Sequence, residues 1–442
     1  MATVLRREDC EAAVRNFIKS SDFVLEDYKF KPLSDKTMGF MGRHLKLTAS
    51  VRFGGVVQQL RLFAKLIPTG GSHRSFVVDL DFFKKEMIAY DTLVPRLISC
   101  LPQGMALPVP MCFFTRGIAS GPGTIPIPGS ADEELIILED VTQRGYRILE
   151  NFPPMDVPHC RAALRALARL HASSILLEES CRAAQPANFD PRRDLFAGVK
   201  ESFLLNQKEG HTGYAWAKRC AESLTTASFT MWPELFRGVS RDSVMEGMMR
   251  GWTRVFEAAQ PSDEFPNVLC HGDMWTNNIM FSEEKGELDA LLVDLQLVRY
   301  APPAFDILLF LHVCTKRAFR ERHLEELLKF YHEALGECLP AGFLERFLPF
   351  GKLLEMCDCQ RDAARVICTG YLPIILGEND EVIGAEKESS SEPLNLDETM
   401  MKDRGDRIVS NCIRSENYKE WITEAFQDCL FALNLCRQYK RS

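Results

Sequence analysis

The 442-residue sequence predicts an α+β fold of two lobes, a small β-rich amino-terminal lobe and a larger helical carboxy-terminal lobe. Three observations lead to this prediction. Strand-like runs recur before residue 140, helical periodicity dominates from Pro158 onward, and two short strand-like runs interrupt the helical part at 278–297. We place the boundary between a lobe of residues 1–138 and a lobe of residues 139–442.

The amino-terminal lobe is expected to begin with three strands, because β-branched and alternating apolar residues recur at 28–32, 45–53 and 57–67. Gly54 and Gly55 indicate a hairpin turn between the last two strands. A helix should follow over 79–94, with apolar residues three and four positions apart and Pro95 as its end. Strands at 111–114 and 135–138 complete the lobe.

The carboxy-terminal lobe is predicted to be mostly helical. Its first helix begins near Pro158, with Asp156 as a candidate cap. Further helices are expected at 198–206, 214–224, 241–259, 304–315, 323–335, 343–359 and 417–437. Residues 378–405 are rich in Glu, Asp and Ser and predict a mobile acidic loop.

Composition narrows the class of protein. The net charge of −8 argues against a nucleic-acid partner, because such binding depends on clustered Lys and Arg. No run of 18 apolar residues and no apolar amino-terminal segment is present, so we expect no membrane partner and no signal peptide. The 15 cysteines are scattered, as is typical of free thiols in a reducing compartment, and predict a cytoplasmic protein.

The most informative stretch contains His271, Asp273 and Asn278, followed by an apolar run that carries Asp294. A polar turn at 282–287 predicts a hairpin that brings Asn278 near Asp294. A lone carboxylate in a buried strand is costly, and a divalent cation is its natural partner. Taken singly, Asp273 could be a helix cap and Asp294 a surface residue of an edge strand.

The spacing of these residues favours phosphoryl transfer. An Asn five residues after an Asp matches the catalytic loop of kinases. We therefore predict Asp273 as the catalytic base for an acceptor hydroxyl, and Asn278 and Asp294 as oxygen ligands of Mg²⁺.

Lys65 and Glu86 are the candidates for orienting the phosphates of ATP. Lys65 lies in the middle of an apolar strand, where a cation needs a counter-charge, and Glu86 lies on the next predicted helix. The alternative is a solvent-facing lysine at a strand edge and a surface glutamate.

Two weaker signals complete the predicted nucleotide site. Gly39 and Gly42 precede the lysine strand, and glycine permits close approach of the backbone to phosphate oxygens. A simple hairpin turn is the alternative for this loop. Backbone of the Glu139–Val141 segment, after the last strand of the first lobe, could pair with an adenine edge.

The sequence resembles the ecdysteroid kinase-like family, a relative of choline and aminoglycoside kinases with a protein-kinase-like fold. The resemblance extends over roughly residues 36 to 315 and is carried by five segments: 138–141, 167–172, 268–281, 292–300 and 303–306. The form Cys-His-Gly-Asp-x-Trp-x-x-Asn, at 270–278, is specific for this family.

The resemblance implies the same roles for the site residues named above and adds two structural ones. Asp306 would bond the backbone of the catalytic loop, and His271 would brace that loop. Leu295 stands where members usually have Phe, an exchange of similar volume that should not disturb the metal site. The glycine loop departs from the family pattern.

The resemblance predicts an ATP- and Mg²⁺-dependent small-molecule kinase that phosphorylates a hydroxyl of a steroid-like acceptor, such as an ecdysteroid. A choline- or aminoglycoside-type kinase is one alternative, and a catalytically silent nucleotide-binding module is another. The retained Lys65, Asp273, Asn278 and Asp294 argue against the silent module. Aromatic residues such as Trp216 and Trp252 could line an acceptor pocket, although for most of them helix packing is the favoured interpretation.

Overall fold

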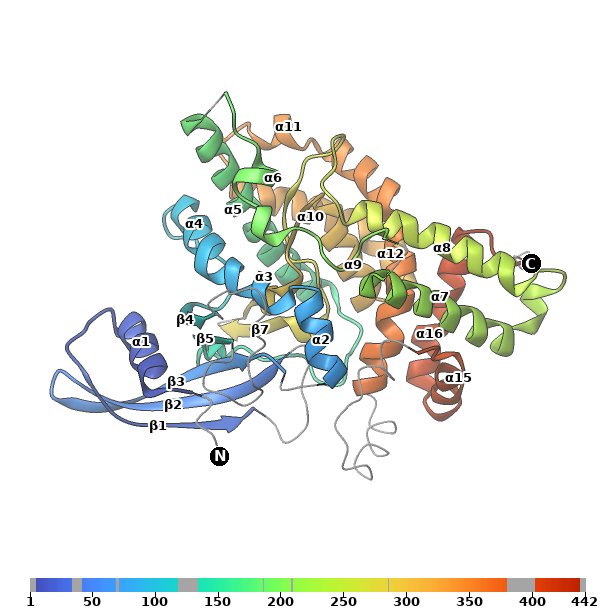
Figure 1. Cartoon of the computed structure of the whole chain (residues 1–442). Coiled ribbons are helices and arrows are strands. Elements are labelled where there is room, and N and C mark those ends of the chain that lie inside the picture. The colour runs from blue at the N-terminus through green and yellow to red at the C-terminus, as the bar shows by residue number, and fades with distance from the viewer. Residues whose placement is uncertain are drawn as a thin grey trace.

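The computed structural model describes residues 5–33, 42–68, 71–117, 134–185, 187–207, 210–284, 286–379 and 402–437. The α+β prediction is confirmed. Figure 1 shows a sheet at the amino-terminal end and a larger body of helices, with α2–α4 between them.

The sheet of the amino-terminal lobe has five antiparallel strands in the order β1-β2-β3-β5-β4. Their bounds are Val24–Pro32, Arg43–Phe53, Val56–Leu66, Cys112–Arg116 and Leu135–Glu139 for β1 to β5. Gly54 and Gly55 form the two-residue turn between β2 and β3 with φ of 57° and 80°, a conformation that disfavours other residues. The register places His44 of β2 opposite Lys65 of β3.

A helix that the sequence analysis did not identify precedes the sheet. α1 spans Arg7–Ile18 and buries Cys10, Ala13 and Val14 in the core on one face of the sheet. Asp9 of α1 forms an ion pair with Arg116 of β4, and both side chains are largely buried. The helix therefore closes this face of the sheet.

The helical segment between β3 and β4 is longer than predicted. It consists of α2 (Gly71–Asp79), α3 (Phe82–Ile88), a π-helical turn (Ala89–Leu93) and α4 (Val94–Cys100). The prediction that Pro95 ends the helix is wrong. Pro95 lies in the first turn of α4, where a missing backbone N–H breaks no helical hydrogen bond.

The first long helix of the carboxy-terminal lobe is α5 (Val157–Ala184), and the side chain of Asp156 caps it by accepting a hydrogen bond from the His159 backbone N–H. The other long helices are α7 (Thr212–Met231), α8 (Arg241–Ala258), α9 (Ala304–Cys314), α10 (Arg317–Glu337), α12 (Phe350–Asn379), α15 (Gly405–Arg414) and α16 (Glu416–Ala432). Two short helices are α6 (Pro191–Asp194) and α11 (Leu344–Phe347). α12 packs against α8, α9 and α16 and is therefore the centre of this lobe.

Three predictions for this lobe need correction or stay open. The helix expected at 198–206 is wrong, because only a 3₁₀ turn at Ala197–Val199 forms there. The helix expected at 343–359 is divided into α11 and the start of α12. Of the acidic loop expected at 378–405, residues 380–401 lie outside the described residues, while α12 ends at Asn379 and α15 begins at Gly405.

The predicted hairpin is present. Its strands are β7 (Ile279–Glu284) and β8 (Glu287–Leu292), and a second pair joins β6 (Val268–Cys270) to β9 (Arg299–Ala301). Ile279 pairs with Leu292, and the Val293 N–H donates to the Asn278 carbonyl at 2.9 Å. The hairpin thus holds the two ends that carry Asn278 and Asp294 side by side.

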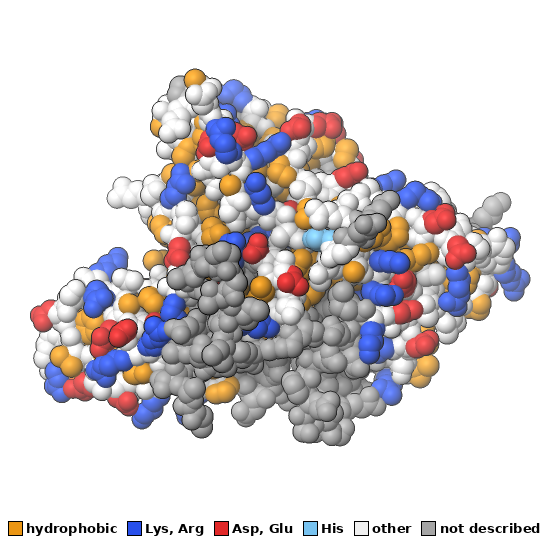
Figure 2. Space-filling model, in the orientation of Figure 1, with side chains coloured by type: hydrophobic (Ala, Val, Ile, Leu, Met, Phe, Trp, Pro, Cys, Tyr) orange, Lys and Arg blue, Asp and Glu red, His pale blue; other side chains and the backbone are white. Residues whose placement is uncertain are grey.

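Two general expectations can be compared with the structure. All fifteen cysteines are unpaired, as predicted. No helix in the described part of the chain combines the length and the apolar character that crossing a bilayer requires. On the face shown in Figure 2, basic and acidic side chains are intermixed over the described surface.

The core of the carboxy-terminal lobe contains an aromatic pair that leads to a stability prediction. Trp252 of α8 and Trp216 of α7 are fully buried and meet edge to face at 5.2 Å. Trp252→Ala should lower the free energy of unfolding by about 3–5 kcal/mol, because it removes a large buried side chain and leaves a cavity. Urea denaturation measures this loss. Ile413→Ala, at a side chain that is 82% exposed, should change stability by less than about 0.5 kcal/mol, and an equal loss in both variants would contradict the assignment.

Candidate active site

The loop between β6 and β7 carries the predicted catalytic residues, and its shape depends on Gly272. This glycine has φ of +83°, and a Cβ atom on it would lie 2.1 Å from the Leu297 carbonyl oxygen. No other residue can therefore occupy this position without moving the backbone. The tight turn directs the following residue, Asp273, into a cavity between the lobes.

Asp306, near the start of α9, holds this loop in place. Its two carboxylate oxygens accept hydrogen bonds from the backbone N–H groups of His271 (2.6 Å) and Gly272 (2.8 Å), and His171 lies 3.2 Å from the same carboxylate. Burial by itself would raise the pKa of Asp306, but the bond and charge of His171 and the bond from Gly272 lower it below its usual value. The carboxylate therefore stays ionised inside the protein and fixes the loop.

His271 joins the catalytic loop to the strand end before Asp294. Its Nε2 donates to the Val293 carbonyl at 2.9 Å, and its Nδ1 accepts from the Asp273 backbone N–H at 3.3 Å. Both ring nitrogens are thus used in structural hydrogen bonds. This arrangement agrees with a bracing role and leaves neither nitrogen for proton transfer.

The sequence analysis assigned no role to a buried ion pair behind the loop. Arg299 of β9 lies 2.7 Å from Glu201, and both side chains are 1% exposed. Arg299 also donates to the carbonyls of Leu297 (3.1 Å) and Gly272 (3.4 Å). The sequence offers a signal for Arg299, because a cation beside the apolar residues of β9 needs a counter-charge. It offers none for Glu201, which lies in an irregular segment far away along the chain.

Lys65 lies at the meeting point of the lobes. Its Nζ is 2.6 Å from Glu86 Oε2 and 2.8 Å from Asp294 Oδ1, with Lys65 and Glu86 almost fully buried. Burial alone would lower the pKa of Lys65, but the two carboxylates outweigh it and raise that pKa. Burial raises the pKa of Glu86 to about 7 although Lys65 opposes the shift. The structure thus brings together the predicted pair and adds Asp294 to it.

Asp273 and Asn278 are also in contact. The Asn278 amide nitrogen donates to Asp273 Oδ2 at 2.7 Å and to the Asp273 carbonyl at 2.9 Å. Burial, and then the nearby charge of Asp294, raise the pKa of Asp273, while His271, Tyr371 and Asn278 partly offset this shift. Asp294 has φ of +70°, which is uncommon for a residue with a side chain, and Gln296 holds its Oδ2 at 3.1 Å.

The donor set fits a magnesium ion. Both side-chain hydrogen bonds of Asn278 to Asp273 use its amide nitrogen, so its amide oxygen is left to serve as a ligand. Asp294 supplies a carboxylate from the adjacent end of the hairpin. Oxygen ligands of these two types are those that Mg²⁺ takes in nucleotide sites.

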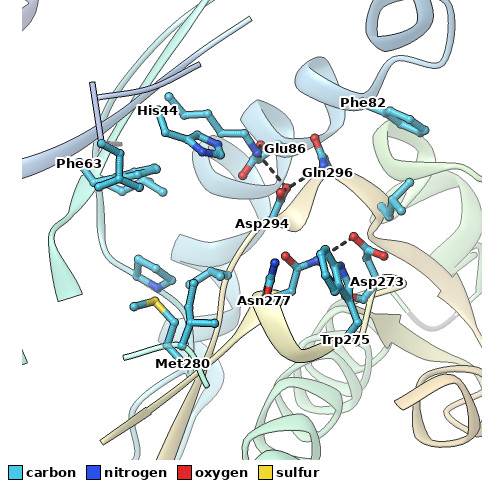
Figure 3. A pocket seen from close by; sticks show the side chains of 18 of the residues that line it. His44, Phe63, Phe82, Glu86, Asp273, Trp275, Asn277, Met280, Asp294 and Gln296 are labelled. Carbon is cyan, nitrogen blue, oxygen red and sulfur yellow. Dashed lines mark hydrogen bonds and ion pairs between the residues drawn. The ribbon is translucent and has the colours of Figure 1, made fainter. Parts of the chain in front are cut away.

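A cavity of about 250 Å³ between the lobes is lined by Lys65, Glu86, Asp273, Asn278 and Asp294. In Figure 3, Asp294 lies near its middle, with His44, Phe63 and Met280 on one side and Phe82, Asp273 and Trp275 on the other. The linker residues Glu139 and Val141, which lie at and just after the end of β5, line the cavity. Gly42 lies against Lys65, because a Cβ on it would be 3.0 Å from Lys65 Cε. Gly39 lies outside the described residues.

The side of the cavity beyond Asp273 is aromatic and aliphatic. It is lined by Phe82 of the smaller lobe and by five residues of the larger one: Phe203, Trp216, Tyr371, Ile374 and Ile375. Trp216 therefore contacts the cavity, whereas Trp252 and Phe310 are core residues. The last three lining residues belong to α12, far from the catalytic motif in sequence.

The comparison with protein families identifies the chain. Residues 36–341 match the family described as ecdysteroid kinase-like. The chain belongs to this family. Membership confirms the resemblance in the sequence and identifies the protein as a kinase by class. The matched segment contains the catalytic loop and the hairpin, but ends before α12.

Solved structures of small-molecule kinases are similar at low identity. The aminoglycoside phosphotransferase APH(3'')-Id from Streptomyces rimosus, in complex with ADP and streptomycin, is 16% identical, with 74% of this chain and 92% of that chain covered and a TM-score of 0.34. A microcompartment-associated aminopropanol kinase is 11% identical, with coverage of 97% and 98% and a TM-score of 0.38. The AMP-bound spectinomycin phosphotransferase APH(9)-Ia is 14% identical, with coverage of 80% and 90% and a TM-score of 0.34. No curated protein matches the chain.

The brace on the catalytic loop leads to a second prediction. Asp306→Asn should lower the free energy of unfolding by about 3 kcal/mol, because one backbone N–H would then face an amide nitrogen inside the protein. Urea denaturation measures the loss. Asp358→Asn, at a 66% exposed carboxylate, is the control and should have almost no effect. A small effect of Asp306→Asn would show that other contacts suffice to hold the loop.

Proposed function

We propose that this protein transfers the γ-phosphoryl group of ATP to a hydroxyl of a small, largely apolar alcohol of the steroid type. The observation that carries this proposal is the composition of the cavity. Catalytic oxygens and a buried lysine lie at its centre, and an apolar wall extends beyond the predicted base. The site roles below belong to the same proposal.

The nucleotide would occupy the side with His44, Phe63 and Met280. Lys65 would hold the α- and β-phosphates, and Glu86 would fix Lys65. Gly42 allows the backbone to approach the phosphates, and backbone groups between Glu139 and Val141 would pair with the adenine edge. The contact between Gly42 and the Lys65 stem, and the place of the linker in the cavity wall, support this arrangement.

Asn278 and Asp294 would hold magnesium between the phosphates and the catalytic loop. The bound ion would supply positive charge against the β- and γ-phosphate oxygens. Asp273 would accept a hydrogen bond from the acceptor hydroxyl, align it with the phosphorus and take its proton. Most of the rate enhancement would come from positioning and electrostatics, because the groups are already fixed by buried hydrogen bonds.

The lining residues support a neutral acceptor. Among the described residues, the charged side chains around the cavity are Lys65, Glu86, Glu139, Asp140, Asp273 and Asp294, and apart from Asp273 all belong to the nucleotide and metal side. An aminoglycoside carries several positive charges and would need more carboxylates near Asp273. Trp216 and Phe203 could face a quaternary ammonium group, which keeps choline as the second candidate.

The remaining alternatives find less support. A silent nucleotide-binding module would have no need for an intact set of base, metal ligands and lysine, all of which converge here.

The free thiols of all fifteen cysteines support a reducing, cytoplasmic location as a further part of the proposal.

A substrate panel tests the proposal. Steroid alcohols, choline and aminoglycosides would each be incubated with MgATP, and phosphorylated products would be detected by mass spectrometry. Asp273→Ala and Asp294→Ala should each reduce transfer to the true acceptor by at least about 100-fold, because each removes a group that acts at the reacting centre. Glu283→Gln, at an exposed residue of β7, should retain activity. Near-normal turnover in either alanine variant, or transfer to cationic acceptors alone, would refute the proposal.

The apolar wall gives a separate prediction. Ile374→Ala should raise KM for an apolar acceptor about tenfold and leave KM for MgATP unchanged, because it removes apolar contact area from the acceptor side only. Steady-state kinetics with each substrate varied in turn separates the two constants. Ile367→Ala is a matched control on the same helix, since Ile367 lines a separate small cavity together with Val255 and Leu308. Equal changes in both variants would mean that Ile374 acts through stability alone.

A further inference from the structure

We propose that Arg299 is a positioning residue that ties the apolar wall of the cavity to the catalytic loop through its buried ion pair with Glu201. The pair thereby sets how far an acceptor held by the wall lies from the predicted base, Asp273. The inference rests on the proposed function and deepens it, because it gives a role in acceptor placement to two residues outside the cavity lining.

Glu201 holds the segment that supplies Phe203 to the apolar wall. One of its carboxylate oxygens, Oε1, accepts hydrogen bonds from the backbone N–H groups of Phe203 (2.6 Å) and Leu204 (2.8 Å). The Phe203 ring meets the Phe82 ring edge to face at 5.6 Å, and its centroid lies 4.9 Å from that of Trp216. The carboxylate therefore fixes the residue at which wall residues from the two lobes meet.

Arg299 forms the other end of the link, at the turn of the catalytic loop. Its Nη1 lies 2.7 Å from Glu201 Oε2, while Nε donates to the Leu297 carbonyl at 3.1 Å and Nη2 to the Gly272 carbonyl at 3.4 Å. The side chain fits here because Gly272 has no Cβ, which would lie 2.9 Å from Arg299 Nε. The guanidinium also lies over the Phe305 ring, 4.6 Å from its centroid. One planar group thus contacts the anchor of the wall and the catalytic loop together.

The chemistry of the two side chains suits a rigid link. Burial by itself would raise the pKa of Glu201, but the charges of Arg299 and Lys85 and the two backbone N–H groups lower it below its usual value. The carboxylate is therefore ionised opposite the guanidinium. Because a guanidinium carries its donors in one fixed plane, holding several acceptors at once fixes their relative positions. A shift of the wall segment relative to the Gly272 turn would break at least one of these contacts.

The link matters because an acceptor must touch both of the parts that it joins. A steroid-type alcohol would lie against Phe203 while its hydroxyl meets Asp273, and a misplacement of about 1 Å can reduce the rate about 100-fold. The nucleotide side is held separately, by the ion pairs of Lys65 with Glu86 and Asp294. Weakening the link should therefore impair use of the acceptor and leave nucleotide binding intact.

Glu201→Gln tests the link, because the amide keeps an acceptor for both backbone N–H groups and removes only the charge that holds Arg299. It should lower kcat/KM for the acceptor about tenfold and leave KM for MgATP within twofold. Hydrogen exchange followed by mass spectrometry should become about tenfold faster in residues 200–205 and stay unchanged in 270–275, which Asp306 holds. If Glu201 served only as a local hydrogen-bond acceptor, the exchange of 200–205 would not change.

Arg299→Lys is a second variant that tests the link from the loop. It keeps a cation beside Glu201 and so leaves no buried charge unpaired, but an ammonium lacks the planar fork that reaches the carboxylate and both carbonyls. It should give the same losses as Glu201→Gln, and it replaces that variant if the latter does not fold.

Asp428→Asn is the matched control. Asp428 pairs with the largely buried Arg320 at 3.2 Å, and neither residue lines the cavity. Like Glu201→Gln, this change takes the charge from the carboxylate partner of an arginine. It should lower the urea midpoint but leave kcat/KM for the acceptor and the exchange of 200–205 unchanged.

Wild-type exchange in 200–205, or an unchanged kcat/KM for the acceptor, in either folded link variant would overturn the inference. If the wild-type protein phosphorylates no acceptor, the proposed function fails, and the exchange of 200–205 still decides whether Arg299 positions the wall.

Discussion

The arrangement of the site depends on one buried cation. Moving an ammonium group out of water costs several kcal/mol, and Lys65 offsets this cost with two carboxylates from different parts of the chain. Glu86 comes from α3 of the smaller lobe and Asp294 from the end of the hairpin in the larger one. The lobes are thus held together at the position where the phosphates of a nucleotide would bind, and each carboxylate is positioned by the same charge.

The parts of the site that the sequence predicts are those in which the interacting residues are close along the chain. Asn278 and Asp294 are brought together by one hairpin, whose turn residues and apolar runs are visible in the sequence. Lys65 on β3 and Glu86 on α3 are separated along the chain only by α2, and a lysine in an apolar strand by itself indicates a missing counter-charge. Local spacing and the cost of burial are sufficient for these contacts.

Where the prediction fails, distant contacts decide the structure. Pro95 does not end its helix, because a π-helical turn places it at the start of α4. The segment expected to be helical at 198–206 instead directs Glu201 toward Arg299, a partner almost a hundred positions away. α1 is stabilised by the sheet it covers. No local pattern encodes such long-range partners, so tertiary packing overrides the intrinsic preference.

The proposed catalytic groups and much of the apolar wall of the cavity are held in place by different parts of the chain. The predicted base, the metal ligands and the lysine are fixed by short connections within the family-matched segment, and two backbone hydrogen bonds to Asp306 hold the loop regardless of what lies beyond it. Much of the proposed acceptor wall comes from α12, which follows that segment and packs against α7, α8, α9 and α16. Substitutions at the cavity-lining positions of α12 can therefore change the shape of the proposed acceptor space while the groups proposed to carry out phosphoryl transfer stay in place.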